Sequence, residues 1–365
     1  MIRAVLVDDE PPARQRMRQL LDAAGDVTVV GEAGSAVEAR DVIRRTRPDL
    51  LFLDVEMPEV RGTALAAELP EPRPFIVFAT AFDHYALDAI AVDATDYLLK
   101  PVSRTKLAAT LDRVRARLAR QRVEHDVVAA SVVQAHMWPV ALPGIPGFDC
   151  AAASLPARGV GGDFYDVFPI SDAGRWGLLL GDASGKGVAA GLVASAVQAR
   201  VNTAARHALL APDQLMAAVD RDVYGTTDGA RYATAIYGSL DTTRRELTLV
   251  NAGHPALLML PAGGVSVDRY PATGPALGLI QAGRFEARSI ALAPGAILLA
   301  VTDGVTDAQD ERGSEFGDDG LGRLLAASRH LSAAQLCETV LAAVRTHRGT
   351  RQDQDDVTVM VVKVQ

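Results

Sequence analysis

Groups able to bind a cation or a phosphoryl group follow short apolar runs in the first hundred residues. They are Asp8 and Asp9 after Ala4–Val7, Asp54 after Leu50–Leu53, Thr80 after Phe75–Phe78, and Lys100 after Tyr97–Leu99. Clustered carboxylates repel one another, and a hard divalent cation such as Mg²⁺ offsets that repulsion by taking oxygen ligands. A single acid after a strand often only caps the next helix. Capping does not explain so many such groups in this arrangement.

The elements that would position these groups are buried strands alternating with helices. The four runs show no alternation of polar and apolar residues, which is typical of parallel strands covered on both faces. Val27–Val30 is a weaker fifth run, and helical patterns lie between the runs at Ala13–Ala23 and Ala36–Arg45. This order predicts a doubly wound α/β domain. Ligands bind at the carboxyl ends of strands in such sheets, so we expect the groups to share one crevice.

The motifs VLVDDEPPAR, DVEMP, ATAF and DYLLKP resemble a response-regulator receiver domain, expected over residues 1–120. Met57-Pro58 and Gly62 match the loop after the phosphoacceptor of that family. The resemblance implies these roles: Asp54 as phosphoacceptor; Asp8, Asp9, Asp54 and the backbone carbonyl of Glu56 as Mg²⁺ ligands; Thr80 and Lys100 as phosphoryl contacts; Tyr97 as switch aromatic. It also implies a sensor histidine kinase as partner. The segment ATAFDHYALDAI is similar to receivers most often paired with DNA-binding output domains.

A long connector helix is predicted over residues 103–138. Leu107, Leu111, Val114 and Leu118 recur at spacings of four and three, which is a coiled-coil stripe. A single helix of this length would extend about 50 Å. Two interpretations remain open: the stripe packs on the receiver's own core, or it forms a homodimer whose geometry the receiver controls. The first half is rich in arginine, but no helix-turn-helix pattern accompanies it, so we do not expect DNA contacts.

A second set of acids stands in turns and at the ends of apolar runs beyond residue 139. They are Asp163 after Gly161-Gly162, Asp182 after Leu178-Leu179-Leu180, Asp303 after Ala296–Thr302, and Asp355-Asp356 before Val357–Val364. No His or Cys stands at ligand spacing, which favours Mg²⁺ or Mn²⁺ over Zn²⁺. Lys186 follows a glycine as in a phosphate loop, but the glycine spacing and the missing Ser or Thr exclude that motif. Sequential strands with short turns predict antiparallel sheets with helices outside them.

The motifs PARGVGGDFYDVF, LLLGDASGKGVAAG, YATAIYGSLD, LTLVNAGHPALL, LLAVTDGVTDA and QDDVTVMVVKV resemble the SpoIIE/RsbU-type branch of the PPM metal-dependent serine/threonine phosphatases. The resemblance implies an α-β-β-α sandwich over residues 140–365 and two Mn²⁺ or Mg²⁺ ions. Its implied ligands are Asp163, Asp182 and the carbonyl of Ala183 for the second metal, and Asp303 and Asp355 for the first. Asp182 would bridge both metals and hold the water between them that attacks phosphorus.

Departures and undecided residues qualify this resemblance. The arginine that binds substrate phosphate in the eukaryotic enzymes has no evident counterpart. Trp138 stands where the branch usually has leucine before Pro139, and it could alter how the helix docks. Lys186 either attracts the anionic substrate or sits in solvent, and we favour solvent. His254 is a general acid or a turn-shaping residue, and we prefer the turn.

Composition limits the remaining classes. The chain has 365 residues, a formal net charge of −8 and two cysteines in no paired motif, which fits a cytoplasmic protein and disfavours nucleic acid as a partner. No apolar run approaches a membrane span. We therefore expect a response regulator whose output is a serine phosphatase acting on a phosphorylated STAS-type anti-sigma-factor antagonist. The alternative is a non-enzymatic adaptor that binds a partner of that pathway.

Overall fold

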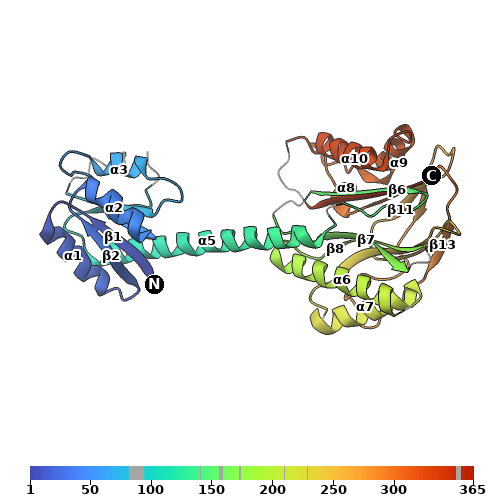
Figure 1. Cartoon of the computed structure of the whole chain (residues 1–365), viewed down its shortest axis with the longest axis horizontal. Helices are drawn as coiled ribbons and strands as arrows, with labels where there is room; N and C mark the ends of the chain where they lie inside the picture. Colours follow the sequence, from blue (N-terminus) through green and yellow to red (C-terminus); the bar gives the residue numbers. More distant parts are fainter. Residues whose placement is uncertain are drawn as a thin grey trace. The chain divides into compact units, whose positions relative to one another are not determined.

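The computed structural model describes residues 1–81, 94–139, 141–155, 159–171, 174–208, 210–227, 229–350 and 355–365. The chain divides into two compact units, Met1–Glu124 and His125–Gln365 (Figure 1). Helix α5, Arg104–Met137, contributes residues to both units. None of the helices in these described ranges is long and apolar enough to cross a membrane.

The first unit is built on one parallel sheet with the strand order β2-β1-β3-β4-β5. Its strands are β1 (Ile2–Val7), β2 (Val27–Ala33), β3 (Leu50–Leu53), β4 (Phe75–Thr80) and β5 (Asp96–Leu99). All four strand pairs are parallel. Every residue of β3 is buried, as its unbroken apolar run predicts. The predicted doubly wound sheet is therefore confirmed.

Helices cover both faces of this sheet, because the side chains of each strand alternate between two cores. Helices α2 (Ala36–Thr46) and α3 (Gly62–Glu68) pack on one face, and α1 (Pro11–Asp22) packs with α5 on the other. The side chain of Ser35 caps α2 by accepting a hydrogen bond from the N–H of Glu38. This layering leaves the carboxyl ends of the strands free for the acids that follow them.

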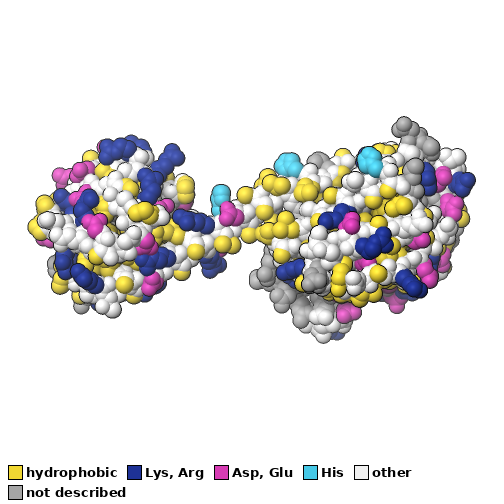
Figure 2. Space-filling model, turned by 90° about the horizontal axis from the view of Figure 1, so that it is seen from below, with side chains coloured by type: hydrophobic (Ala, Val, Ile, Leu, Met, Phe, Trp, Pro, Cys, Tyr) yellow, Lys and Arg dark blue, Asp and Glu magenta, His cyan; other side chains and the backbone are white. Residues whose placement is uncertain are grey.

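The apolar stripe of α5 packs on the core of the first unit. Leu107, Leu111 and Val114 are buried among residues of β1, β3 and α1, so that interpretation is confirmed for the first half of the helix. The second half differs. Four valines there are between 54% and 64% exposed: Val123, Val128, Val132 and Val133. Exposed hydrophobic side chains of this kind are yellow in Figure 2.

The second unit contains two antiparallel five-stranded sheets, ordered β13-β10-β9-β8-β7 and β12-β11-β14-β15-β6. The strands of the first are β7 (Asp163–Ser171), β8 (Arg175–Ala183), β9 (Ala233–Asp241), β10 (Glu246–Ala252) and β13 (Arg288–Ala291). Those of the second are β6 (Phe148–Leu155), β11 (Leu257–Leu260), β12 (Asp268–Tyr270), β14 (Ile297–Val301) and β15 (Val357–Val364). The apolar faces of the two sheets share one core.

Helices close both outer faces of this sandwich (Figure 1). Helices α6 (Val188–His207) and α7 (Pro212–Thr227) pack on the first sheet, and α9 (Gly317–Ala327) and α10 (Ala333–Arg348) pack on the second. The short helix α8, Asp303–Thr306, begins just beyond β14. The predicted α-β-β-α sandwich is confirmed.

Two strands of the second unit have no clear signal in the sequence. They are β6 and β7, which precede β8, the strand that carries Leu178-Leu179-Leu180. Strand β6 is rich in alanine, and β7 is interrupted by Asp166 and Pro169, so neither shows a strong apolar run.

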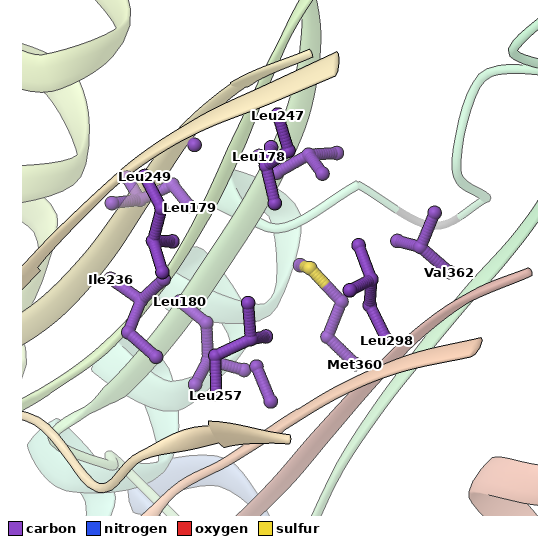
Figure 3. A pocket seen from close by; sticks show the side chains of 12 residues that line it. Leu178, Leu179, Leu180, Ile236, Leu247, Leu249, Leu257, Leu298, Met360 and Val362 are labelled. Atoms are coloured by element: carbon purple, nitrogen blue, oxygen red, sulfur yellow. The ribbon is translucent and has the colours of Figure 1, made fainter. Parts of the chain in front are cut away.

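A small cavity remains between the two sheets, about 20 Å³ in volume (Figure 3). Leucines of β8 and β10 line one side, and Leu298, Met360 and Val362 line the other. The walls are almost entirely apolar, so a water there would find no hydrogen-bond partners. The cavity is therefore a packing defect of the core and not a ligand site.

Candidate phosphoacceptor and metal sites

The acids of the first unit converge at the carboxyl edge of its sheet. Asp8, Asp9 and Asp54 offer carboxylate oxygens that all lie within 4.8 Å of one another. Their approach follows from the pairing of β1 with β3, since Asp8 and Asp54 each follow one of these strands. Lys100 Nζ lies 2.7 Å from Asp8 Oδ2 and 2.6 Å from Asp54 Oδ2. The structure thus brings four predicted groups together.

Two observations fit a phosphoryl group on Asp54 and a cation beside it. Thr80 Oγ1 is buried and has no hydrogen-bond partner among the described residues. A buried hydroxyl without a hydrogen-bond partner lowers the stability of the fold. A phosphoryl oxygen on Asp54, which follows the neighbouring strand β3, would accept its hydrogen bond. Burial also raises the pKa of Asp54, and the hydrogen bond from Lys100 offsets part of that rise. A bound cation would relieve the resulting penalty on the charged carboxylate.

The other predicted receiver residues lie close by. The backbone N–H of Glu56 donates to Asp54 Oδ1 at 3.3 Å, so the loop after β3 is folded back onto the acid. Tyr97 is half-buried in β5 and pairs with Phe78 of β4, two residues before Thr80. Residues 82–90 of the segment ATAFDHYALDAI lie outside the described ranges.

The acids of the second unit come from both sheets of the sandwich. Asp163 opens β7 and faces Asp182 of β8 in the strand register. Asp303 begins α8 directly beyond β14, and Asp355 lies two residues before β15, the neighbour of β14. All four predicted ligands therefore stand at the same end of the two sheets.

Hydroxyl groups hold Asp163 in place. It is only 2% exposed, and Asp163 Oδ2 accepts hydrogen bonds from Thr302 Oγ1 at 2.8 Å and Thr358 Oγ1 at 2.6 Å. Burial and the neighbouring charge of Asp182 raise the pKa of Asp163 well above its usual value. Each threonine stands three or fewer residues from a predicted ligand, in the motifs TDG and DDVT. Sequence reasoning did not assign them a role.

Asp182 is the most crowded of these carboxylates. Burial first, and then the charges of Asp303 and Asp355, raise its pKa to about 7. A Cβ atom placed on Gly162 would lie 2.8 Å from Asp182 Oδ1 and 2.7 Å from the carbonyl oxygen of Ala183. The two predicted ligand oxygens thus converge on a space that only glycine leaves open, which fits a metal site.

The predicted first-metal ligands are more widely spread. Burial and the charge of Asp355 raise the pKa of Asp303. The side chain of Asp355 is 52% exposed and pairs with Lys186, with Nζ 3.3 Å from Oδ2. Within the described residues, no three of these acids have oxygens all within 4.8 Å of one another. The Lys186 side chain is exposed, in line with the preferred solvent position, but it also pairs with a predicted ligand, which the sequence did not indicate.

Asp356 is a site residue to which sequence reasoning gave no role. Its Oδ2 accepts a hydrogen bond from the N–H of Gly162 at 2.7 Å, and its charge acts on both Asp163 and Asp182. A Cβ on Gly304 would lie 1.9 Å from the Asp356 carbonyl oxygen, so Gly304 must be glycine for α8 to approach β15. The pair of adjacent aspartates, Asp355-Asp356, is the feature of the sequence that could have identified it.

His254 lies beneath this centre and joins the two sheets. Its Nε2 donates to the Val301 carbonyl of β14 at 3.1 Å, and its Nδ1 accepts from Thr234 Oγ1 of β9 at 2.8 Å. Complete burial lowers the pKa of His254 to about 3. A histidine that stays neutral and makes both bonds within the protein supports the structural interpretation over the general acid.

Comparisons with known proteins agree with both halves. The family described as Stage II sporulation protein E (SpoIIE) matches residues 172–365, and the response regulator receiver domain matches residues 4–112. The Salmonella typhi transcriptional regulatory protein BtsR is 48% identical over 124 residues, which are 34% of this chain and 52% of that protein. Its Escherichia coli counterpart is 46% identical over 128 residues, 35% of this chain and 52% of that protein. The chain thus spans about half the length of the curated relatives it matches.

Solved structures resemble the second unit's fold. The SiaA-PP2C domain of Pseudomonas aeruginosa matches with a TM-score of 0.59 and 21% identity, covering 68% of this chain and 99% of that one. The RsbU and RsbW domains of a Mycobacterium tuberculosis protein match with a TM-score of 0.54 and 29% identity, covering 62% of this chain and 64% of that one. The second unit thus has the fold of PP2C phosphatase domains and the sequence of the SpoIIE family, and it is joined to a response regulator receiver domain. The chain belongs to the SpoIIE family.

Proposed function

We propose that this chain is a response regulator in which phosphorylation of Asp54 controls a metal-dependent protein serine phosphatase centred on Asp182. The observation that carries the enzymatic part is the burial of Asp182 among other carboxylates: burial first, and then the charges of Asp303 and Asp355, raise its pKa to about 7. Like charges held this close are stabilised by bound divalent cations, and Mn²⁺ and Mg²⁺ take oxygen ligands. The domains would be the receiver over residues 1–120, the connector over 103–138 and the phosphatase over 140–365.

The residues of the centre would divide the work as follows. Asp163, Asp182 and the Ala183 carbonyl would hold one cation, and Asp182, Asp303 and Asp355 the other. Bound cations supply Lewis acidity and a water of lowered pKa. The protein's own part is to fix the ligands, since Thr302 and Thr358 orient Asp163 and Asp356 anchors Gly162. In the receiver, Asp8, Asp9, Asp54 and the Glu56 carbonyl would hold Mg²⁺.

The competing function is a non-enzymatic adaptor, and metal-dependent turnover separates the two. Full-length protein with Mn²⁺ should hydrolyse p-nitrophenyl phosphate and a phosphoserine protein. Asp182→Asn should reduce turnover by at least about a thousandfold while the protein stays folded. Asp222→Asn, an exposed aspartate on α7, is the matched control and should leave turnover unchanged. Absence of Mn²⁺-dependent turnover in the parent protein would favour the adaptor.

Regulation would pass through α5. Within the second unit, the buried side chain of Gln134 on α5 forms two hydrogen bonds with the backbone of Gly161: Nε2 donates to its carbonyl at 2.8 Å, and Oε1 accepts from its N–H at 3.0 Å. Gly161 lies two residues before Asp163. A shift of α5 would therefore move the strand entry that positions a predicted ligand. The exposed valines of α5 would form a homodimer contact.

The substrate we propose is a phosphorylated STAS-type anti-sigma-factor antagonist, which would make the chain part of a partner-switching pathway in the cytoplasm. The support is the resemblance of its motifs to the SpoIIE/RsbU branch and its likeness to a structure that contains RsbU and RsbW domains. A sensor histidine kinase would phosphorylate Asp54. Assaying serine-phosphorylated STAS proteins from the same genome as substrates tests this; turnover no faster than that of an unrelated phosphoserine protein would contradict it.

A further inference from the structure

Three cationic side chains contact segments that carry or adjoin the predicted ligands of the second unit, and they differ in how they are partnered. Lys186 Nζ is paired with Asp355 at 3.3 Å. Arg348 donates to the carbonyl of Gly304, beside Asp303. Arg231 forms no ion pair with any residue in the described part of the chain, and its only hydrogen bond there is a long one of 3.4 Å from Nη1 to the Ser184 carbonyl.

The strand register places Arg231 next to the turn that follows Asp182. Asp182 pairs with Thr234 and Ala183 with Ala233. The pairing continues past the end of β8, because the N–H of Ser184 donates to the Tyr232 carbonyl at 2.8 Å and the N–H of Tyr232 donates to Ser184 Oγ at 3.0 Å. Arg231 is thus one pair further along, three residues and about 10 Å along the strand from Thr234, the partner of Asp182, at ~3.3 Å per residue.

Gly185 makes room for the guanidinium at this position. A Cβ atom on Gly185 would lie 2.6 Å from Arg231 Nη1, and the residue has a φ of +94° that side chains rarely adopt. Any other residue would push the guanidinium away from the turn. The turn after the central aspartate therefore holds a half-buried cation whose N–H donors find few partners among the described residues.

We propose that Arg231 binds the phosphoryl group of the substrate at the acid centre. A guanidinium presents five N–H donors in a planar fork that matches two phosphoryl oxygens, and arginine carries its charge at every working pH. Lys186 and Arg348 are already engaged by groups of the predicted first-metal side. This inference rests on the proposed phosphatase function and deepens it, because it gives the substrate anion a protein ligand besides the cations.

Steady-state kinetics and phosphate binding by the full-length protein test this assignment. With saturating Mn²⁺, Arg231→Gln should raise KM for p-nitrophenyl phosphate and the inhibition constant of inorganic phosphate by about tenfold or more. Arg231→Lys should recover part of the loss, and it provides a second variant if the glutamine form does not fold. Arg323→Gln, an exposed arginine on α9, is the matched control. Mn²⁺ affinity, measured by electron paramagnetic resonance of the free ion, should stay unchanged.

Direct binding of inorganic phosphate by calorimetry separates failure of this inference from failure of the proposed function. An inactive parent protein would refute the phosphatase, and loss of phosphate binding in Arg231→Gln would still support the assignment. An active parent with unchanged KM and phosphate binding in the variant would overturn the assignment alone. A fall in Mn²⁺ affinity would also overturn it, because Arg231 would then act on the metal site.

Discussion

Mild acid should destabilise the second unit through His254. In the folded protein this side chain is buried and neutral, with Nε2 bonded to Val301 and Nδ1 to Thr234. Its pKa is lowered from the ordinary 6.5 to about 3 because burial disfavours the charged form. Below pH 6.5 His254 binds a proton in the unfolded chain but stays neutral in the folded protein. The contribution to stability is therefore complete above pH 6.5 and is lost as the pH falls towards 3.

The size of the effect follows from this difference in proton binding. One pH unit below the unfolded pKa changes the free energy of unfolding by about 1.4 kcal/mol for one proton. Between pH 7.5 and 5.5, His254 alone should therefore cost the folded unit about 1.4 kcal/mol. Other groups titrate in the same range, so the quantity to compare is the pH dependence with and without the histidine.

Urea denaturation followed by tryptophan fluorescence measures this quantity selectively. Both tryptophans of the chain, Trp138 and Trp176, belong to the second unit, so their signal reports that unit and not the receiver. His254→Gln is expected to be less stable at both pH values but to lose about 1.4 kcal/mol less on acidification than the parent protein. Equal losses in the two proteins would refute the assignment of a buried neutral histidine.

Three further changes have defined outcomes. Gly62→Ala should destabilise the receiver by about 1–3 kcal/mol or more, because its Cβ would lie 1.9 Å from the Asp54 carbonyl oxygen. Circular dichroism should show the lower stability of the receiver, while the unfolding midpoint measured by tryptophan fluorescence should not change. Lys186→Met should tighten Mn²⁺ binding by up to about fivefold, since it removes a half-exposed ion pair with Asp355; weaker binding would contradict this. Gln134→Leu should abolish any response of turnover to Asp54 phosphorylation while Mn²⁺ affinity is kept; a full response would argue against coupling through Gly161.

The receiver fold could be predicted from the sequence because its central strands β1, β3 and β4 are largely buried. They contain unbroken apolar runs, and the acids or hydroxyl directly after those runs mark the edge where the strands meet. The edge strand β2 gives only a weaker run and is mostly half-buried. The convergence of Asp8, Asp9 and Asp54 needed only the rule that parallel strands end at one edge. The buried Thr80 hydroxyl has no hydrogen-bond partner in the described ranges, and this could not be predicted because it depends on side-chain positions.

The second unit was harder to predict where its strands lie at sheet edges. Both β6 and β7 are edge strands, so their residues need not be uniformly apolar. The pairing of Lys186 with Asp355 was also missed, because it joins residues far apart in the chain. Likewise, the apolar stripe of the connector was equally compatible with a dimer contact and with packing on the receiver. Only the fold shows that Leu107 and Leu111 lie in the receiver core.

The most direct test of the account is the turnover of full-length protein with and without beryllofluoride, which mimics the acylphosphate of Asp54. Mn²⁺-dependent hydrolysis of a phosphoserine protein should change with beryllofluoride in the parent, and stay constant in Asp54→Asn. If Asp54 is shown to carry beryllofluoride and turnover remains the same, control of the phosphatase by the receiver is contradicted.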